Sequence, residues 1–371
     1  MVRTTVLRIL LAGLLLVVSS SSQTIPPQGA AHAQSAAAGT WQGRVEALVL
    51  DNFQTGSSRT RYFLHTASET LELQVEGTAN LRSGQAVEAT GRIAGRRIIA
   101  ARVTALDSGP APSACAATGE QKMLVILASF PSKALFSSVT PALVEASFFG
   151  AGRTLNTFLL ESSYGQTSIT GNVVGPYVLD ADYLDQPLSV RDAALRAASP
   201  FTNLTQYNRI FVVAPQGQTG MDSGGMALLG CGQVPSPQGT LDASSIWMGA
   251  ESMVGQDAIV DIASHETGHA FGLEHARFAD YSGEPLGPAG QAPAPWDSLH
   301  EYGDSFSSMG RNSAQWAAPH KSWLGWLQAG TNIQTVNANG TFTIRIDSVQ
   351  QNVPIDPAVF TMPLPSSHGQ P

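Results

Sequence analysis

The pattern of hydrophobic and polar positions divides the chain into two parts. In residues 40–107, apolar and polar residues alternate along five short segments, which Gly, Ser and Asn turns separate. A period of two is typical of half-buried β-strands. The expected strands are 41–50, 61–66, 70–76, 85–91 and 97–106. Five strands in so short a stretch predict a compact all-β barrel.

The pattern changes from residue 119 onward. Two continuous apolar runs, 122–130 and 209–214, are typical of strands that are buried on both faces. Helices are expected at 141–149, 153–162 and 190–198, and further strands at 167–178 and 245–248. Strand and helix therefore alternate, which predicts a sheet covered by helices.

The N-terminus has the parts of an export signal. Arg3 and Arg8 precede an apolar run over 9–18, and Ala31-His32-Ala33 follows. The run is too short for a membrane-spanning helix, which needs about 20 apolar residues. A charged start, a short apolar centre and a small-x-small motif indicate a secretory signal peptide at 1–33. We therefore expect a secreted, extracellular protein with no membrane association after cleavage; the alternative is a buried N-terminal helix.

Composition excludes two classes of protein. The 20 Lys and Arg against 28 Asp and Glu give a net charge of −8, and 43 % of the residues are hydrophobic. A disordered polyelectrolyte would be less hydrophobic, and a nucleic-acid binder that works by bulk charge would be basic. Asp180, Asp182 and Asp185 resemble a calcium loop, but Leu184 takes the place of a ligand and the required glycine is missing. We interpret a solvated turn there, so Ca²⁺ has no support as a cofactor.

Cys115 and Cys231 are the only cysteines. An exported chain meets oxidising conditions, under which such a pair tends to form a disulfide. The alternative is that Cys115, in a Gly-, Pro- and Ala-rich linker at 108–118, supplies a thiolate that occupies a metal in a precursor. That alternative leaves Cys231 without a partner.

The most informative segment is the run QDAIVDIASHETGHAFGLEHA. Its apolar residues recur at helical spacing, and Asp257 is expected to cap the helix at its start. His265 and His269 are four residues apart, so both imidazoles project from one face and can reach a single cation. Gly272 can adopt a positive φ and end the helix, which would return His275 as a third ligand.

Three neutral histidines suit zinc, and they leave a fourth position open for water, as in catalytic sites. Zinc lowers the pKa of such a water to about 7 and polarises a carbonyl group. Glu266 directly follows the first histidine. We expect it to accept the proton of the water as a general base and to pass the proton to the leaving group.

The run HETGHAFGLEH matches the HExxHxxGxxH signature of the metzincin metallopeptidases, and Ser308-Met309-Gly310 lies where those enzymes have their Met-turn. The segments SYGQTSITGNVVGPYVL, EYGDSFSSMG and APHKSWLGWL resemble gametolysin-like peptidases in particular. The resemblance implies that the three histidines bind zinc, that Glu266 is the general base and that Met309 lies beneath the metal.

The resemblance also implies a fold. The expected class is α+β, with a metzincin-like zinc peptidase domain at 119–329 that has a twisted mixed sheet and an active-site helix, and a β-like tail at 330–371. The strands of 40–107 resemble OB-like β-barrels that precede secreted hydrolase domains as propeptide or accessory domain. The strand around 246–249 is expected to be a sheet edge along which an extended peptide pairs.

A long Gly- and Pro-rich connection runs over 277–308. Connections of this length are usually functional or mobile. We expect Tyr302 or Asp304 in it to contact and orient a zinc ligand. The alternative is an ordinary surface loop.

The leading hypothesis is a secreted zinc metalloendopeptidase, a monomer with one Zn²⁺ that acts on protein or peptide substrates and binds no nucleic acid. An alternative from another class is a non-catalytic extracellular binding protein with a structural zinc site. A third hypothesis is a zinc hydrolase that acts on something other than peptides.

Overall fold

The computed structural model describes residues 38–75, 79–106, 116–217, 224–281, 299–310, 314–338 and 340–341. The predicted signal peptide, residues 107–115 of the linker region and residues 342–371 of the predicted tail lie outside these ranges. Within them, no helix combines the length and the apolar character that crossing a membrane requires.

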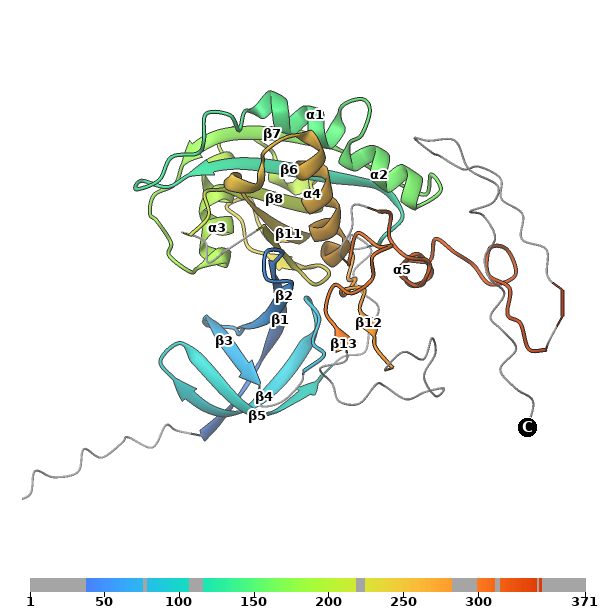
Figure 1. Cartoon of the computed structure of the whole chain (residues 1–371). Coiled ribbons are helices and arrows are strands. Elements are labelled where there is room, and N and C mark those ends of the chain that lie inside the picture. The colour runs from blue at the N-terminus through green and yellow to red at the C-terminus, as the bar shows by residue number, and fades with distance from the viewer. Residues whose placement is uncertain are drawn as a thin grey trace, which may run out of the picture.

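The N-terminal unit consists of five strands that pair in a closed circuit (Figure 1). Its strands are β1 (Ala38–Asn52), β2 (Ser57–His65), β3 (Thr70–Val75), β4 (Ala86–Ala94) and β5 (Arg97–Ala105). β1 pairs with β2 and β4, β2 with β3, β3 with β5, and β5 with β4. The five predicted strands are confirmed, because alternate side chains such as Val45, Ala47 and Val49 fill one shared core.

The C-terminal unit is built on a mixed sheet. Its strands are β6 (Gly119–Ser129), β7 (Thr167–Val178), β8 (Arg209–Ala214), β9 (Gly225–Leu228), β10 (Gly232–Val234) and β11 (Leu241–Gly249). The order β9-β11-β8-β6-β7 is parallel from β11 to β7, and β9 is antiparallel to β11. A large mixed sheet with few helices agrees with the α+β class.

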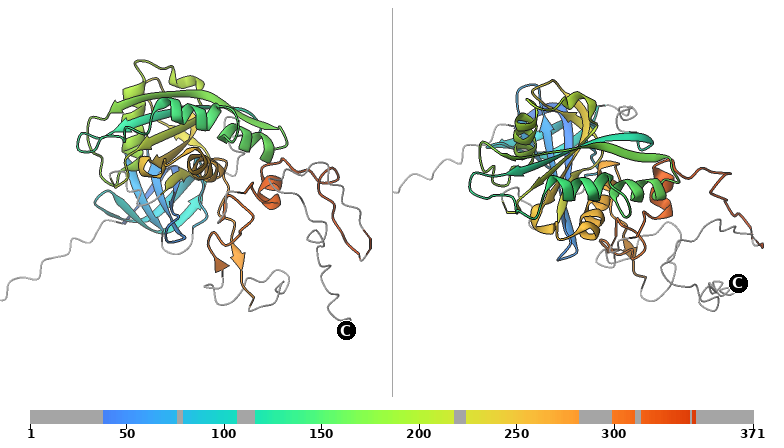
Figure 2. Two further views of the ribbon diagram at one scale, coloured as in Figure 1. Left: turned by 45° about the horizontal axis from the view of Figure 1, so that its top comes forward. Right: turned by 90° about the horizontal axis from the view of Figure 1, so that it is seen from above.

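Helices cover both faces of this sheet (Figure 2). They are α1 (Pro141–Phe149), α2 (Leu155–Ser162), α3 (Pro187–Ala198), α4 (Gln256–Ala270) and α5 (Ala318–Trp323). Side chains of the strands alternate between the two faces. Ile210 and Val212 of β8 share a core with α3, whereas Phe211 and Val213 share a core with α1, α2 and α4. The apolar runs are continuous because both faces are covered.

The two units share one sheet of eleven strands, because β1 also pairs with β9. The antiparallel register joins Leu48 to Leu228, Val49 to Ala227 and Leu50 to Met226. β11 therefore lies between β9 and β8, so the predicted sheet edge at 246–249 is wrong. Along the order β9-β11-β8-β6-β7, the outer strands of the C-terminal unit are β9 and β7, and β1 pairs along the outer side of β9.

Candidate metal centre

Helix α4 carries the predicted motif, but it does not begin with the predicted cap. Gly255 is the N-cap residue, so the expectation for Asp257 is wrong. Asp257 lies in the first turn of the helix, where a carboxylate is favoured by the helix dipole. Its carboxylate also accepts a hydrogen bond from Arg153 Nη1 at 2.9 Å.

The helix ends as predicted. Gly272 has a φ of 91°, a conformation that costs glycine little. The Gly272 N–H donates to His269 O at 2.8 Å, and the Leu273 N–H donates to Gly268 O at 2.9 Å. These two bonds form a Schellman motif, which reverses the chain and carries His275 back toward the helix.

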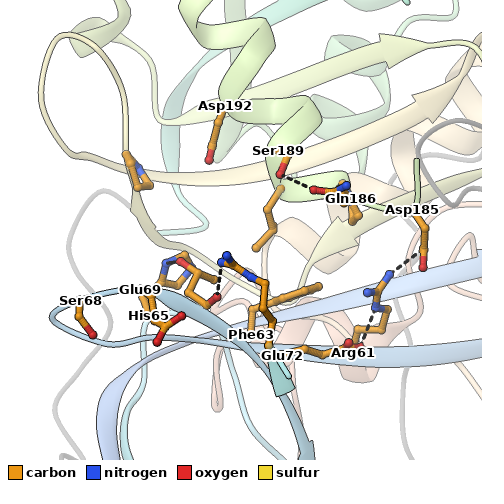
Figure 3. Close-up of a pocket in the computed structure, with 15 residues that line it drawn as sticks. Arg61, Phe63, His65, Ser68, Glu69, Glu72, Asp185, Gln186, Ser189 and Asp192 are labelled. Carbon is orange, nitrogen blue, oxygen red and sulfur yellow. Dashed lines mark hydrogen bonds and ion pairs between the residues drawn. The ribbon is translucent and has the colours of Figure 1, made fainter. Parts of the chain in front are cut away.

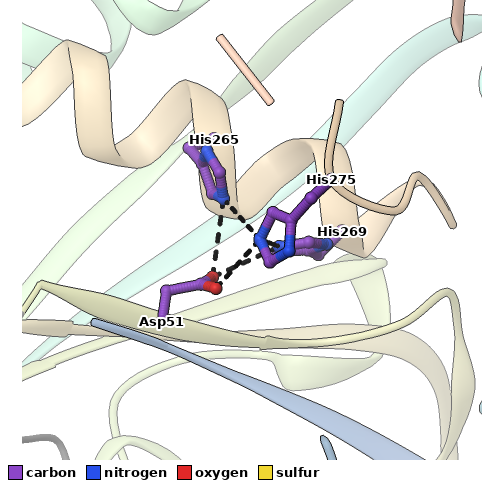
Figure 4. Close-up of side chains that lie close together, drawn as sticks. All are labelled: Asp51, His265, His269 and His275. Carbon is purple, nitrogen blue, oxygen red and sulfur yellow. Dashed lines mark hydrogen bonds and ion pairs between the residues drawn. The ribbon is translucent and has the colours of Figure 1, made fainter. Parts of the chain in front are cut away.

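The three histidines converge through their Nε2 atoms (Figure 4). His275 Nε2 lies 3.1 Å from His269 Nε2 and 3.2 Å from His265 Nε2. All three rings are buried. The structure thus brings together three side chains that the spacing of the motif predicts to be neighbours.

Each histidine uses its other ring nitrogen to hold its orientation. His265 Nδ1 lies 2.6 Å from Ser308 O, and His269 Nδ1 lies 2.7 Å from Leu273 O. Carbonyl oxygens can only accept, so these Nδ1 atoms carry the protons. His275 Nδ1 likewise lies 2.7 Å from Glu301 Oε1. In the neutral form of the rings, the Nε2 atoms therefore face one another as lone pairs, which is the arrangement in which histidine binds a metal.

A fourth side chain, Asp51 of β1, completes the cluster. Its Oδ1 lies 2.9 Å from His275 Nε2, and its Oδ2 lies 3.2 Å from His269 Nε2 and 3.5 Å from His265 Nε2. Sequence reasoning missed this residue, because it stands in the other unit, far from the motif along the chain. An acidic residue directly after the apolar end of a strand was the only local signal.

The donor set fits a metal ion. Zinc–nitrogen bonds of about 2.0 Å in a tetrahedron place neighbouring ligand atoms about 3.3 Å apart, close to the distances between these donor atoms. Asp51 Oδ2 is buried and has no hydrogen-bond partner among the described residues, although two ring nitrogens face it. Lone pairs that face each other in a buried site leave a position for a cation. This Asp51–His265–His269–His275 group can therefore hold a metal ion.

Burial and mutual charge shift the pKa values of the cluster. Burial lowers the pKa of His265 to about 4, so its ring is neutral near pH 7. Burial also disfavours the charge of Asp51, but the three histidines hold its pKa well below the ordinary value. Burial likewise opposes a charged His275, yet Asp51 and Glu301 raise its pKa. Asp51 is thus the carboxylate that lies among the three imidazoles.

Glu266 is fully buried beside the cluster. Neither of its carboxylate oxygens has a hydrogen-bond partner among the described residues. Burial, and then the charge of Asp51, raise the pKa of Glu266 well above the ordinary value. A Cβ on Gly225 of β9 would lie only 2.3 Å from Glu266 Oε1, so glycine at this position leaves the room that the carboxylate occupies.

Met309 lies against α4 between the two helical histidines. A Cβ on Gly268 would lie 2.2 Å from Met309 Sδ, so the side chain packs directly on the helix backbone. The preceding residue, Ser308, supplies the carbonyl that orients His265. The turn at Met309 thus supports the cluster from the side of the helix.

Of the two candidate residues in the long connection, Tyr302 contacts the cluster and the Asp304 side chain bonds within its own turn. Tyr302 is buried, its ring centroid lies 4.1 Å from that of His275, and its hydroxyl donates to Asp51 Oδ1. Asp304 instead accepts a hydrogen bond from the Phe306 N–H at 2.8 Å. The carboxylate that orients a histidine is Glu301, which the sequence did not single out. Residues 282–298 of this connection lie outside the described residues.

Replacing Glu301 by Ala is expected to weaken the binding of an added divalent metal ion by about 10–100-fold, because an imidazole without its carboxylate partner loses orientation and basicity. Competition with a chelating dye measures the change. Asp304→Ala removes an acid three residues away and is expected to leave the affinity unchanged. Equal losses in both variants would contradict the role given to Glu301.

Cys231 and the acidic turn around Asp180 and Asp185 pair with groups outside the metal cluster. Cys231 is buried and takes part in a disulfide bond; its predicted partner, Cys115, lies outside the described residues. Asp180 pairs with Arg196 at 3.2 Å and Asp185 pairs with Arg61 at 2.8 Å. Among the described residues, Asp51 and the three histidines are the one group that could hold a metal ion.

Comparison with known proteins assigns no family to the chain. No family model matches the sequence, and a search of curated proteins finds no significant match.

Proposed function

We propose that the chain is a secreted zinc endopeptidase of metzincin type. The observation that carries the proposal is the meeting of three converging Nε2 lone pairs with a buried glutamate of α4, Glu266, which has no hydrogen-bond partner among the described residues. A protein seldom buries a carboxylate without a partner, because the free-energy cost is high. Functional sites are the usual exception.

The residues of the chain have separate tasks in this proposal. His265, His269 and His275 would hold the zinc ion, and their Nδ1 partners keep the Nε2 atoms directed at one point. Bound zinc would lower the pKa of a water molecule and polarise the scissile carbonyl. Glu266 is placed to accept a proton from this water molecule and to deliver it to the leaving amine. Tyr302, whose hydroxyl reaches the same point, can donate a hydrogen bond to a developing negative charge.

Peptides are the substrate class that the sheet favours. β9 already accepts a strand, β1, through antiparallel pairing over three residues. A sheet edge that pairs with one extended backbone can bind other extended chains with low sequence specificity, because the pairing uses main-chain hydrogen bonds. We also propose that the N-terminal unit is an OB-like barrel and that the protein is exported from the cell.

One observation favours the alternative of a non-catalytic protein with a structural zinc site. Asp51 would be a fourth protein ligand, and zinc sites with four protein ligands are usually structural. The N-terminal unit would then be a permanent part of a closed metal site.

Hydrolysis of an unfolded protein decides between the two. The zinc-loaded chain, intact and after limited proteolysis, is incubated with labelled casein, and zinc content is measured in parallel. The proposal expects cleavage by at least one form, loss of cleavage with a chelator and recovery with zinc. One zinc per chain without cleavage by any form would favour the structural site.

A further inference from the structure

We propose that the β1–β2 hairpin holds the site closed, with Asp51 as an internal ligand in the position that hydrolysis needs open. The inference rests on the proposed function, because it describes the regulation of that same site. The intact chain is then a latent form, and turnover requires displacement of the hairpin.

The alternation of β1 aims Asp51 at the metal position. Leu48 and Leu50 pack in the core on the α3 face of the sheet. Successive side chains point to opposite faces, so Asp51, one residue later, points to the face that carries α4. It reaches all three Nε2 atoms there, at 2.9–3.5 Å. Asp51 would thus supply a protein carboxylate at the fourth position that a catalytic zinc keeps for water.

The same strand covers the margin of β9. The pairs from Leu48–Leu228 to Leu50–Met226 end one residue before Asp51. An extended substrate that adds to β9 beside the metal position would need the backbone groups that β1 already uses. The hairpin therefore blocks both the metal position and the adjoining strand position.

Further hairpin residues contact the histidines. The ring of Phe53 meets His265 edge-on, with 5.0 Å between centroids. Ser58 Oγ of β2 donates to Glu301 Oε1 at 3.2 Å and lies 3.4 Å from His275 Nδ1. Closure is thus a docked arrangement of the hairpin rather than one contact.

The buried Glu266 argues against a permanently closed site. In the closed form it contributes no hydrogen bond among the described residues, and Asp51 adds a second carboxylate nearby. A purely structural His₃Asp site would gain stability from an apolar residue at this position. Once the hairpin has carried Asp51 away, the Glu266 carboxylate can act as the proposed general base.

The other end of the interface is open to solvent. A cavity of about 750 Å³ lies between the N-terminal unit and the start of α3, with charged residues such as Arg61, Glu72 and Asp185 in its wall (Figure 3). Arg61 pairs with Asp185 across it at 2.8 Å. Water and ions can enter this gap, so the units are not sealed together along their whole contact.

Azide binding to the cobalt-loaded full chain tests the inference. Azide has three atoms, like the carboxylate, and its binding changes the absorption spectrum of Co²⁺. A tethered ligand competes at a high effective concentration, so Asp51→Ala is expected to lower the apparent azide Kd by about 100-fold or more. Glu88→Ala removes an acid that bonds Gln42 elsewhere in the N-terminal unit and should behave like the wild type. Asp51→Asn preserves the volume and the acceptor for Tyr302, and is expected to shift the Kd in the same direction.

Equal azide affinity in the wild type and both Asp51 variants would overturn the inference. So would loss of cobalt from both variants, because Asp51 would then be required to hold the metal. The casein assay separates this result from the proposed function. Intact wild type that cleaves casein as fast as the proteolysed chain refutes closure and leaves the peptidase standing. Azide binding restricted to the variants, with no cleavage by any form, supports the internal ligand and refutes the peptidase.

Discussion

On the proposed function, replacing Glu266 by Gln is expected to abolish casein hydrolysis while one zinc ion per chain stays bound. The histidines and their Nδ1 partners are untouched by the change, so the metal position keeps its shape. Gln has nearly the same volume, and it fits the space that Gly225 leaves. It cannot accept a proton, and loss of a general base lowers rates by about 10²–10⁴-fold.

The control for this variant is Glu274→Gln in the same motif. Glu274 is exposed and faces Arg82 at 3.5 Å, so its charge contributes little. Initial rates and zinc content are measured on chains that have been opened by limited proteolysis. Full activity in Glu266→Gln would refute the mechanism. Loss of zinc together with activity would show that the variant reports on the metal site instead.

Local patterns predicted most of the elements. β7 and β8 have the predicted bounds, and so does α1, which starts after the N-cap Thr140 with a proline in its first turn and stops before Gly150. The helical spacing of His265 and His269 and the glycine at position 272 likewise fix their geometry within one turn. Such features depend on neighbours along the chain, so sequence reasoning could reach them.

The parts that the sequence did not predict depend on contacts between distant segments. Asp51 reaches the histidines only because β1 pairs with β9, and no spacing relates the two in the sequence. Glu301 approaches His275 through the path of a long connection. The expected edge at β11 failed for the same reason, since a strand is an edge only when no other segment pairs with it.

A buried ion pair joins the two units and is expected to have the largest single effect on stability. Glu46 of β1 and Arg191 of α3 are almost fully buried, and Oε1 lies 2.5 Å from Nη1. Burial disfavours the charge of Glu46, but Arg191 and then His65 hold its pKa below the ordinary value. Both side chains are thus charged, and each depends on the other.

Replacing Glu46 by Gln is expected to reduce the free energy of unfolding by about 3–5 kcal/mol, because the buried Arg191 would keep only the partly exposed Asp192, 2.9 Å from its Nε, as a counter-charge. Glu72→Gln breaks pairs with Arg61 and Arg97 that are partly exposed, so the expected loss is below about 1 kcal/mol. Urea unfolding measures both. Glu46→Leu with Arg191→Met should regain most of the loss, since an apolar pair leaves no charge unpaired. Equal losses of stability in the two glutamine variants would contradict this expectation. They would mean that Arg191 becomes hydrated in Glu46→Gln because the contact between the two units opens at this point.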